Sequence, residues 1–329
     1  MTNPMQFPNG FVFGGATAAY QVEGETRTHG KGKVPWDDFL AAQGRFSPDP
    51  ASDFYNKYPV DIDLCQRFGI NGIRVSIAWS RIFPNGTGEI NPEGVQFYHD
   101  LFAECHKHHV EPFVTLHHFD TPLPLFEKGD FLNRETIDAF VDFATFCFKE
   151  YTDQVTYWFT FNEPIVEPEQ RYQEGVWFPQ LHDFSRARTV QYHISLAHAL
   201  AVANYRRAYD EGAVRSDAKI GMINCFTPVY TKENPSEADL EAVRMTSGVN
   251  NRWWLDLITK GPPTCSTAWP RAALSFRSVP ATKRFLSRVL STGSVATTTT
   301  PRAFRRRRAR STSTVCRTLP TSTCGPTPL

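Results

Sequence analysis

Short, nearly continuous apolar runs recur along the first 230 residues and predict buried β-strands. β-Branched and aromatic residues are frequent in these runs, and polar or turn-forming residues bound them. Strands that are buried on both faces, as in parallel sheets, have this pattern rather than a strict alternation of polar and apolar positions. We expect five strands, within residues 11–20, 72–80, 111–119, 156–164 and 218–226.

Amphipathic segments separate these runs and predict helices. The apolar residues of 60–68 lie at helical spacing, namely Val60, Leu64, Cys65 and Phe68. Gly69 supplies a stop for this helix, and Asn91 and Asn133 are expected to cap the starts of the next two. A long helix is predicted over about 186–211. Strands that alternate with helices in this order indicate an α/β fold with right-handed crossovers.

The ends of two strands favour one of the two α/β architectures that fit this order, a doubly wound sheet or a (β/α)8 TIM barrel. "HHFD" (117–120) and "FNEP" (161–164) place polar and titratable groups at the carboxyl ends of predicted strands. A TIM barrel draws its chemistry from that face and from several strands. No G-x-G-x-x-G or P-loop follows any strand, which disfavours a nucleotide-binding sheet. The sequence therefore predicts a TIM barrel.

Four motifs occur in order along the chain: "FVFGGATAAYQVEG" (11–24), "NGIRVSIAWSRIFP" (71–84), "VTLHHFDTP" (114–122) and "YWFTFNEP" (157–164). Together they resemble the retaining β-glycosidases of glycoside hydrolase family 1, over about residues 5–260. The segments "ASDFYNKYPVDIDL", "QFYHDLFAECHKHHVEPFVTLHHFDTP" and "KGDFLNRE" are most similar to the bacterial 6-phospho-β-galactosidases. The chain departs from the family pattern in two segments: it has His-His-Phe-Asp at 117–120, where plain β-glucosidases usually have Tyr-His-Trp-Asp, and Glu25 stands where a small residue is usual.

The resemblance implies a sugar site around a catalytic acid/base, Glu163. Asn162 matches the group that binds the sugar 2-hydroxyl. Gln21 and His118 match residues that bind other hydroxyls of the sugar. Arg74 matches the cation that contacts the catalytic nucleophile and keeps it ionised.

The chemistry of the reaction explains why one carboxylic acid is not enough. Cleavage of a glycosidic bond passes through an oxocarbenium-like state, so the leaving oxygen needs a proton and the anomeric carbon needs a carboxylate. Retaining enzymes hold these two carboxyl groups about 5–5.5 Å apart. Glu163 has to be protonated near neutral pH, so we expect its pKa to be raised. Aromatic neighbours such as Trp158 and Phe161, and a second carboxylate, would both act in that direction.

Each candidate residue also has a purely structural interpretation. The alternatives are a strand-ending turn at Glu163, a turn residue at Gln21 and a structural ion pair at Arg74. Adjacent residues of a strand face opposite sides, so only one of His117 and His118 can face the site. We expect the other to be buried, and a metal-binding histidine pair is the less favoured alternative.

The second carboxylate is missing from the sequence. The family's nucleophile is the Glu of a Thr-Glu-Asn-Gly motif, which this chain does not contain. The most similar string, "YTKENPSEAD" (230–239), places Glu233 between charged residues and a proline, which predicts a solvated loop. No nucleophile is therefore identified, and we expect no measurable hydrolysis by this chain.

Composition changes abruptly at Pro262. All 34 acidic residues precede this position, whereas 12 of the 35 basic residues follow it. The tail, 262–329, is rich in Ser, Thr, Pro and Arg and lacks apolar periodicity, which predicts disorder. We therefore expect a partial barrel, truncated after about five strands, in 1–261 and a non-family tail. A shifted reading frame would explain the change; the alternative is a basic arm that binds nucleic acid, centred on "AFRRRRARSTST" (303–314).

The remaining composition narrows the function class. A hydrophobic content of 41% supports a large core, and no secretory signal or apolar run of about 18 residues is present, so no membrane partner is expected. Four widely spaced cysteines in 1–261 indicate free thiols of a reducing cytoplasm, and no zinc spacing occurs, so we expect no metal and no cofactor. The predicted partner is a small-molecule β-glycoside or phospho-β-glycoside, not nucleic acid. A plain β-glucosidase or β-galactosidase and a non-catalytic remnant are the alternatives.

Overall fold

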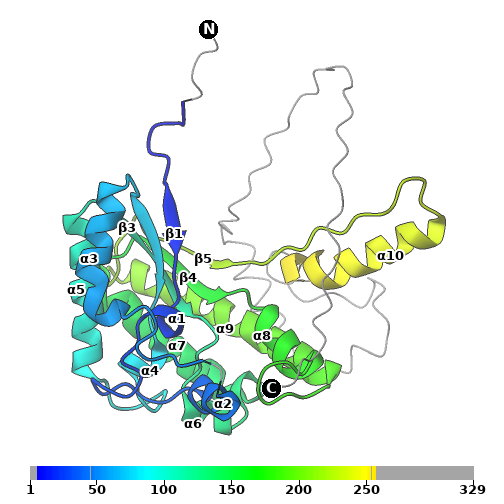
Figure 1. The fold of residues 1–329 in the computed structure, drawn as a ribbon, viewed down its shortest axis with the longest axis horizontal. Helices are drawn as coiled ribbons and strands as arrows, with labels where there is room; N and C mark the ends of the chain where they lie inside the picture. Colours follow the sequence, from blue (N-terminus) through cyan, green and yellow to red (C-terminus); the bar gives the residue numbers. More distant parts are fainter. Residues whose placement is uncertain (1–5, 45, 253, 257–329) are drawn as a thin grey trace. The chain divides into compact units, whose positions relative to one another are not determined.

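The computed structural model describes residues 6–44, 46–252 and 254–256 (Figure 1). The predicted tail and its boundary at residue 261 lie outside the described residues. Its disorder, its shifted reading frame and its binding to nucleic acid therefore stay predictions.

Five parallel strands form one sheet. They are β1 (Gly14–Ala16), β2 (Gly72–Ser76), β3 (Glu111–His117), β4 (Tyr157–Asn162) and β5 (Lys219–Ile223). Their order in the sheet is their order along the chain, and every neighbouring pair is parallel. Each strand lies within its predicted range, which confirms the five predicted strands. Among the described residues, β1 and β5 are the edge strands.

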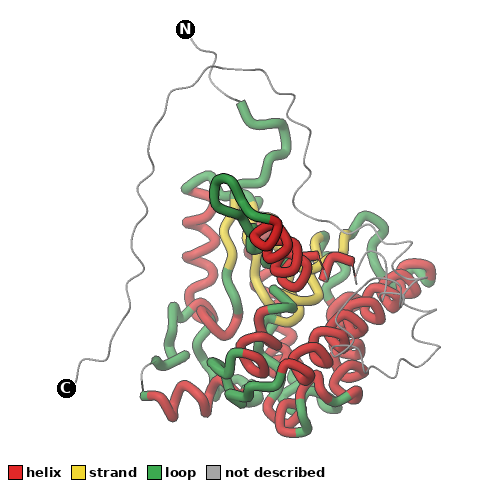
Figure 2. The backbone as a smooth tube through the Cα atoms, turned by 90° about the vertical axis from the view of Figure 1, so that its right-hand side faces the viewer, coloured by secondary structure: helices red, strands yellow, loops and turns green. Residues whose placement is uncertain are grey.

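Long helices connect successive strands, and short ones lie in the connections (Figures 1 and 2). The four long connecting helices are α3 (Phe54–Arg67), α5 (Pro92–Lys107), α7 (Arg134–Glu150) and α9 (Phe184–Asp210). The shorter elements before β5 are α1 (Ala19–Val22), α2 (Pro35–Gln43), α4 (Trp79–Ile82), α6 (Leu123–Glu127), the 3-10 turn η1 (Asp130–Leu132), α8 (Val166–Pro168) and the π-helical turn η2 (Glu169–Gln173). After β5 come α10 (Glu237–Ser247) and the π-helical turn η3 (Gly248–Arg252). Each strand and the helix after it thus form one β/α unit.

Aromatic side chains hold the helices against the sheet. The ring of Phe140 on α7 lies 4.3 Å from that of Phe161 on β4, measured between ring centroids. Trp79, which follows β2, stacks on Phe143 of α7 with centroids 5.3 Å apart. All four of these side chains are fully buried. Such pairs contribute about 0.5–1.5 kcal/mol beyond the apolar area they bury, and they fix α7 beside the carboxyl halves of the strands.

The predicted apolar face of the helix over 60–68 is wrong for Val60 and Phe68, whereas Cys65 packs against the core as predicted. Val60 is 60% exposed and Phe68 is 79% exposed. The helix α3 begins six residues earlier than the pattern indicated, at Phe54. Its packed stripe therefore runs through Phe54, Tyr58 and Ile62, at the four-residue spacing that puts side chains on one face. Val60 lies two residues from Ile62 and so points to another side of the helix.

Candidate active site

Four of the five sequence-predicted site residues lie at the carboxyl edge of the sheet. Arg74 lies on β2, His118 follows β3 directly, and Asn162 ends β4. Glu163 is the next residue after Asn162, and Gln21 lies on α1, which follows β1. The structure therefore places four of the five where parallel strands deliver their loops, whereas Arg74 lies in the middle of β2.

The segment after β1 is tied to the end of β2. The backbone N–H and the hydroxyl of Thr17 donate to the carbonyl of Arg74 at 2.8 and 3.2 Å. The N–H of Ala19 donates to Oγ of the buried Ser76 at 2.7 Å. These bonds fix α1 over β2, and Gln21 on α1 has an exposed side chain, as a ligand-contacting residue needs.

Glu163 lies at a sharp change of backbone direction. Its φ of 42° is in the left-handed region, which a side chain with a Cβ rarely adopts. Its N–H donates to the carbonyl of Ile223 on β5 at 2.8 Å, and its carbonyl accepts from Val166 at 2.9 Å. An irregularity in the β4–β5 register lies just before it, between Phe159 and Asn162. Glu163 therefore lies in a strand-ending turn, and its bond to Ile223 of β5 holds that turn at the sheet edge.

The negative charge of Glu163 acts on the guanidinium of Arg74. Burial lowers the pKa of the Arg74 guanidinium, and the negative charge of Glu163 acts in the opposite direction. The Nε atom of Arg74 is buried and has no hydrogen-bond partner among the described residues. Arg74 also makes no ion pair within 4.0 Å in that part of the chain. A structural ion pair thus does not account for this arginine, and Nε can still bind an acceptor.

The two adjacent histidines have different surroundings. The ring of His117 is fully buried against Phe131 and Phe161, and its Nε2 lies 3.0 Å from Oγ1 of Thr121. Burial lowers the pKa of His117 to about 4. His118 is less buried; burial and then Arg74 lower its pKa to about 3, and its Nδ1 has no partner among the described residues. The prediction that one histidine is buried and satisfied is confirmed, and that residue is His117.

Two further polar groups lie at this edge: Asn224, which was not predicted from the sequence, and Asp120, which belongs to the predicted "HHFD" segment but was given no role there. Asn224 follows β5, and its Oδ1 is buried without a partner in the described part of the chain. Asp120 is fully buried and accepts a hydrogen bond from the N–H of His118 at 3.1 Å. Burial raises the pKa of Asp120 to about 7. Both residues come shortly after a strand, as His118 and Glu163 do, and this position could have pointed to them in the sequence.

The described residues add no candidate for the missing catalytic nucleophile. Glu233 lies in an exposed loop beyond β5, which confirms the predicted solvated loop. The negative charge of Glu163 acts to raise the pKa of two groups, the guanidinium of Arg74 and the thiol of Cys225. Neither is a carboxylate, so neither supplies the second carboxyl group.

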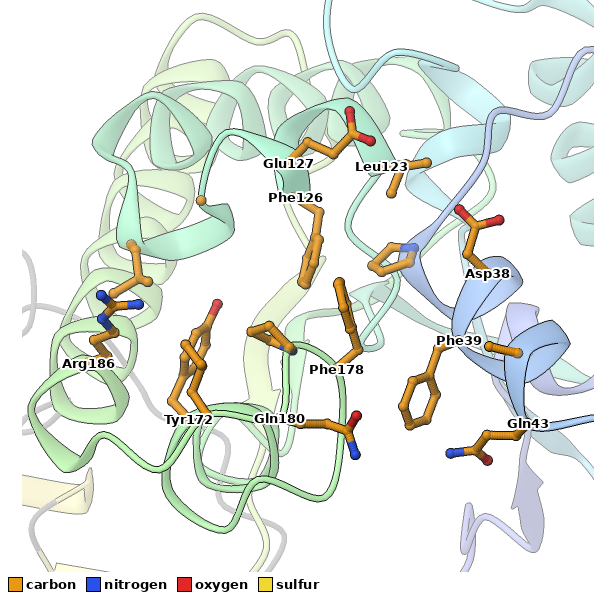
Figure 3. Close-up of a pocket in the computed structure, with 16 residues that line it drawn as sticks. Asp38, Phe39, Gln43, Leu123, Phe126, Glu127, Tyr172, Phe178, Gln180 and Arg186 are labelled. Atoms are coloured by element: carbon orange, nitrogen blue, oxygen red, sulfur yellow. The ribbon is translucent and has the colours of Figure 1, made fainter.

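A cavity of about 850 Å³ lies apart from these residues (Figure 3). Its walls come from α2, α6 and the segment around 172–186, and Phe39, Phe126 and Phe178 point into it. Charged groups at its margin are Asp38, Glu127 and Arg186. None of the five predicted site residues lines it, so the cavity is not the candidate catalytic centre.

The family assignment follows from the sequence as a whole. Residues 3–273 match the sequence model of glycosyl hydrolase family 1. The chain belongs to glycosyl hydrolase family 1. This confirms the predicted family, and the β/α architecture of the described residues agrees with the predicted barrel fold. No helix in the described ranges is long and apolar enough to cross a membrane.

The similar curated proteins are named 6-phospho-β-galactosidases, whereas similar solved structures are named β-glucosidases. A Staphylococcus aureus 6-phospho-β-galactosidase is 50% identical over 250 residues, which is 76% of this chain and 52% of that protein. The chain thus spans about half the length of the curated relatives it matches. A Thermotoga maritima β-glucosidase in complex with castanospermine is 32% identical, with a TM-score of 0.75 over 87% of this chain and 64% of that one. A rice β-glucosidase in a covalent complex with Glc is 30% identical, with a TM-score of 0.77 over 86% and 62%.

Proposed function

We propose that this chain carries the sugar-binding and proton-donating half of a retaining β-glycosidase that acts on 6-phospho-β-galactosides. The observation that carries the proposal is the proximity of Glu163, Arg74 and His118, because the charge of Glu163 acts on Arg74 and the charge of Arg74 acts on His118. The 50% identity to 6-phospho-β-galactosidases supports the phosphorylated galactoside as substrate. The four described cysteines are free thiols, which supports a cytoplasmic location.

Each residue has a role that its surroundings allow. Glu163 protonates the leaving oxygen, and Asn162 binds the sugar 2-hydroxyl. Gln21 and His118 bind other hydroxyls. His118 stays neutral over the working pH range because its pKa is about 3, so its free Nδ1 can take part in a hydrogen bond. Arg74 attracts a negative charge to the side of the anomeric carbon opposite the leaving group.

Without a nucleophilic carboxylate, this chain is expected to bind the substrate but not to hydrolyse it. A small anion can replace the missing group in that case. Azide would form a bond between nitrogen and the anomeric carbon as the carbon–oxygen bond breaks, and the phenol would leave with the proton of Glu163. The product would be an α-glycosyl azide, because a single displacement inverts the configuration.

This reasoning gives the decisive experiment. The purified 329-residue chain is incubated with nitrophenyl and phenyl β-galactoside 6-phosphate, with and without azide, and the phenols and sugar products are measured. We expect release only with azide. Glu163→Gln should slow the azide reaction by roughly 10²–10⁴-fold for phenol, the poorer leaving group, and much less for nitrophenol, since general-acid catalysis has that size.

The matched control is Glu233→Gln, which should change neither rate because Glu233 is in a solvated loop. Turnover without azide would contradict the missing nucleophile, and its loss in Glu233→Gln would identify Glu233. Absence of any azide-dependent release would contradict a formed site. The unphosphorylated galactoside and glucoside test the second candidate substrate class, which the β-glucosidases among the solved structures support.

A further inference from the structure

The carbonyl of Phe119 is held by two side chains from distant parts of the sequence. Nε1 of Trp36 on α2 donates to it at 2.6 Å, and Nη2 of Arg171 on η2 donates at 3.3 Å. Phe119 has a φ of 65°, so its backbone is in the left-handed region. For a residue with a Cβ this conformation costs about 1–3 kcal/mol and persists where surrounding bonds enforce it. The two donors to its carbonyl supply such bonds.

Arg171 uses its whole guanidinium to connect three segments. Its Nε donates to Oε1 of Glu167 at 2.8 Å, and its Nη1 donates to the carbonyl of Phe178 at 2.7 Å. With the bond to Phe119, one side chain joins the loop after β3 to two parts of the loop after β4. Its central carbon also lies 5.5 Å from the ring centroid of Trp36. Arg171 is 1% exposed and Glu167 is 2% exposed.

Stability alone is a weak explanation for this arrangement. The desolvation cost of a buried ion pair often equals or exceeds its Coulombic gain. What Arg171 adds is geometry, because a planar guanidinium donates in several fixed directions and a lysine ammonium cannot reproduce that fork. The geometry acts on Phe119, the residue directly after His118.

Phe119 also belongs to an aromatic wall, which we define as Trp36, Phe119 and Trp177. The ring of Trp177 lies 5.0 Å from that of Trp36 and 5.2 Å from that of Phe119, between centroids. The ring of His118 lies 4.9 Å from that of Phe119. A shift of the Phe119 backbone would therefore move the wall and His118 together.

We propose that Arg171 is a positioning residue, whose grip on the Phe119 carbonyl, shared with Trp36, sets the orientation of His118 and of the aromatic wall. The role of the wall and of His118 in sugar binding rests on the proposed function. The hydrogen bonds from Arg171 and Trp36 to the Phe119 carbonyl do not depend on the proposed function. Arg171 touches neither the predicted sugar contacts nor Glu163 directly, so its effect passes through the backbone of Phe119.

The test compares Arg171→Lys and Trp36→Phe with a matched control, Arg81→Lys. Arg81 is also a fully buried arginine that donates through Nε and Nη2 to a buried carboxylate, Glu23, but it does not contact Phe119. Two quantities are measured on the full chain: the His118 imidazole titration, by NMR of ¹³C-labelled histidine, and the affinity for galactose 6-phosphate, by calorimetry. His118 faces the positive charge of Arg74 and the ring of His117 in the wild type.

We expect both site variants to raise the pKa of His118 from about 3 toward the ordinary value, because a loosened loop lets water reach the ring. Affinity for galactose 6-phosphate should fall tenfold or more. Arg81→Lys should leave the His118 titration unchanged, although it loses a comparable buried pair. Folded variants with the His118 titration and the galactose 6-phosphate affinity of the wild type would overturn the proposal. If Arg171→Lys does not fold, the result for Trp36→Phe decides. A wild type that binds no sugar phosphate while His118 still responds would support the grip and contradict the proposed substrate.

Discussion

Asp120 is a fully buried carboxyl group beside His118, and its ionisation makes stability depend on pH. Its pKa is raised to about 7 by burial, above the ordinary value near 3.9 of an unfolded chain. Between these two values the folded state binds the proton more tightly. The stabilisation is therefore complete below about pH 4 and is lost as the pH rises through 7.

Asp120→Asn removes this titration and keeps an oxygen that can accept from His118. The free energy of unfolding of the variant, relative to the wild type, should increase between pH 5 and pH 8. Over this window the increase is at most about 3 kcal/mol, because two pH units separate pH 5 from the pKa of about 7 and each corresponds to 1.36 kcal/mol. Urea unfolding at several pH values measures it. The control Asp138→Asn alters an exposed carboxylate on α7 and should run parallel to the wild type; a parallel curve for Asp120→Asn would contradict the buried, raised pKa.

At the residue scale, the sequence could place the site but not its supports. Strand alternation separated His117 from His118, and the motifs selected Glu163 and Arg74, two residues whose charges interact. The roles of Glu163, Asn162, Gln21, His118 and Arg74 stay predictions. The pairing of Arg171 with Glu167 has the i,i+4 spacing that a sequence shows, but its bonds to the carbonyls of Phe119 and Phe178 could not be predicted, because backbone acceptors leave no mark in side-chain patterns.

At the element scale, α3 shows how an apolar pattern can select the wrong face. Ile62 is fully buried, whereas Val60 is 60% exposed. Ile62→Ala should lower the free energy of unfolding by about 2–4 kcal/mol, as large-to-small core changes do. Val60→Ala should stay within about 0.5 kcal/mol of the wild type. Urea unfolding of both variants tests this, and an equal cost for Val60→Ala would mean that this face is covered in solution.

Helix starts were predicted well where a local bond decides them. Asn133 caps α7 as expected, since its side chain accepts from the N–H of Glu135 at 3.1 Å. Asn91 precedes α5 as expected, but its side chain donates instead to the carbonyls of His29 and Arg81. Its position was readable from the Asn-Pro pair, whereas its bonds depend on a loop 62 residues away. Local propensity thus predicted boundaries, and tertiary contacts decided what each residue binds.

At the scale of the whole molecule, the sheet has two open edges among the described residues. β1 pairs with β2 alone and β5 with β4 alone. All three residues of β1 are exposed, and the neighbouring rings of Phe7, Phe11 and Phe13 form an exposed aromatic cluster. Closed barrels have no such edges, whereas an open edge beside apolar side chains is a template for pairing with another chain. We therefore expect the 329-residue chain to self-associate.

A charge on β1 should weaken that association without disturbing the fold. A Cβ added at Gly15 meets nothing within 4 Å, whereas one at Gly14 would lie 2.4 Å from the carbonyl oxygen of Gly72. Gly15→Lys therefore places an ammonium group on the edge at little steric cost, and charged residues on edge strands oppose edge-to-edge pairing. Sedimentation velocity over a concentration series should show less oligomer than for the wild type. Gly248→Lys adds the same charge far along the chain, also in open space, and should leave the oligomer unchanged. If both variants dissociate equally, net charge and not the β1 edge governs association, because only Gly15→Lys alters that edge.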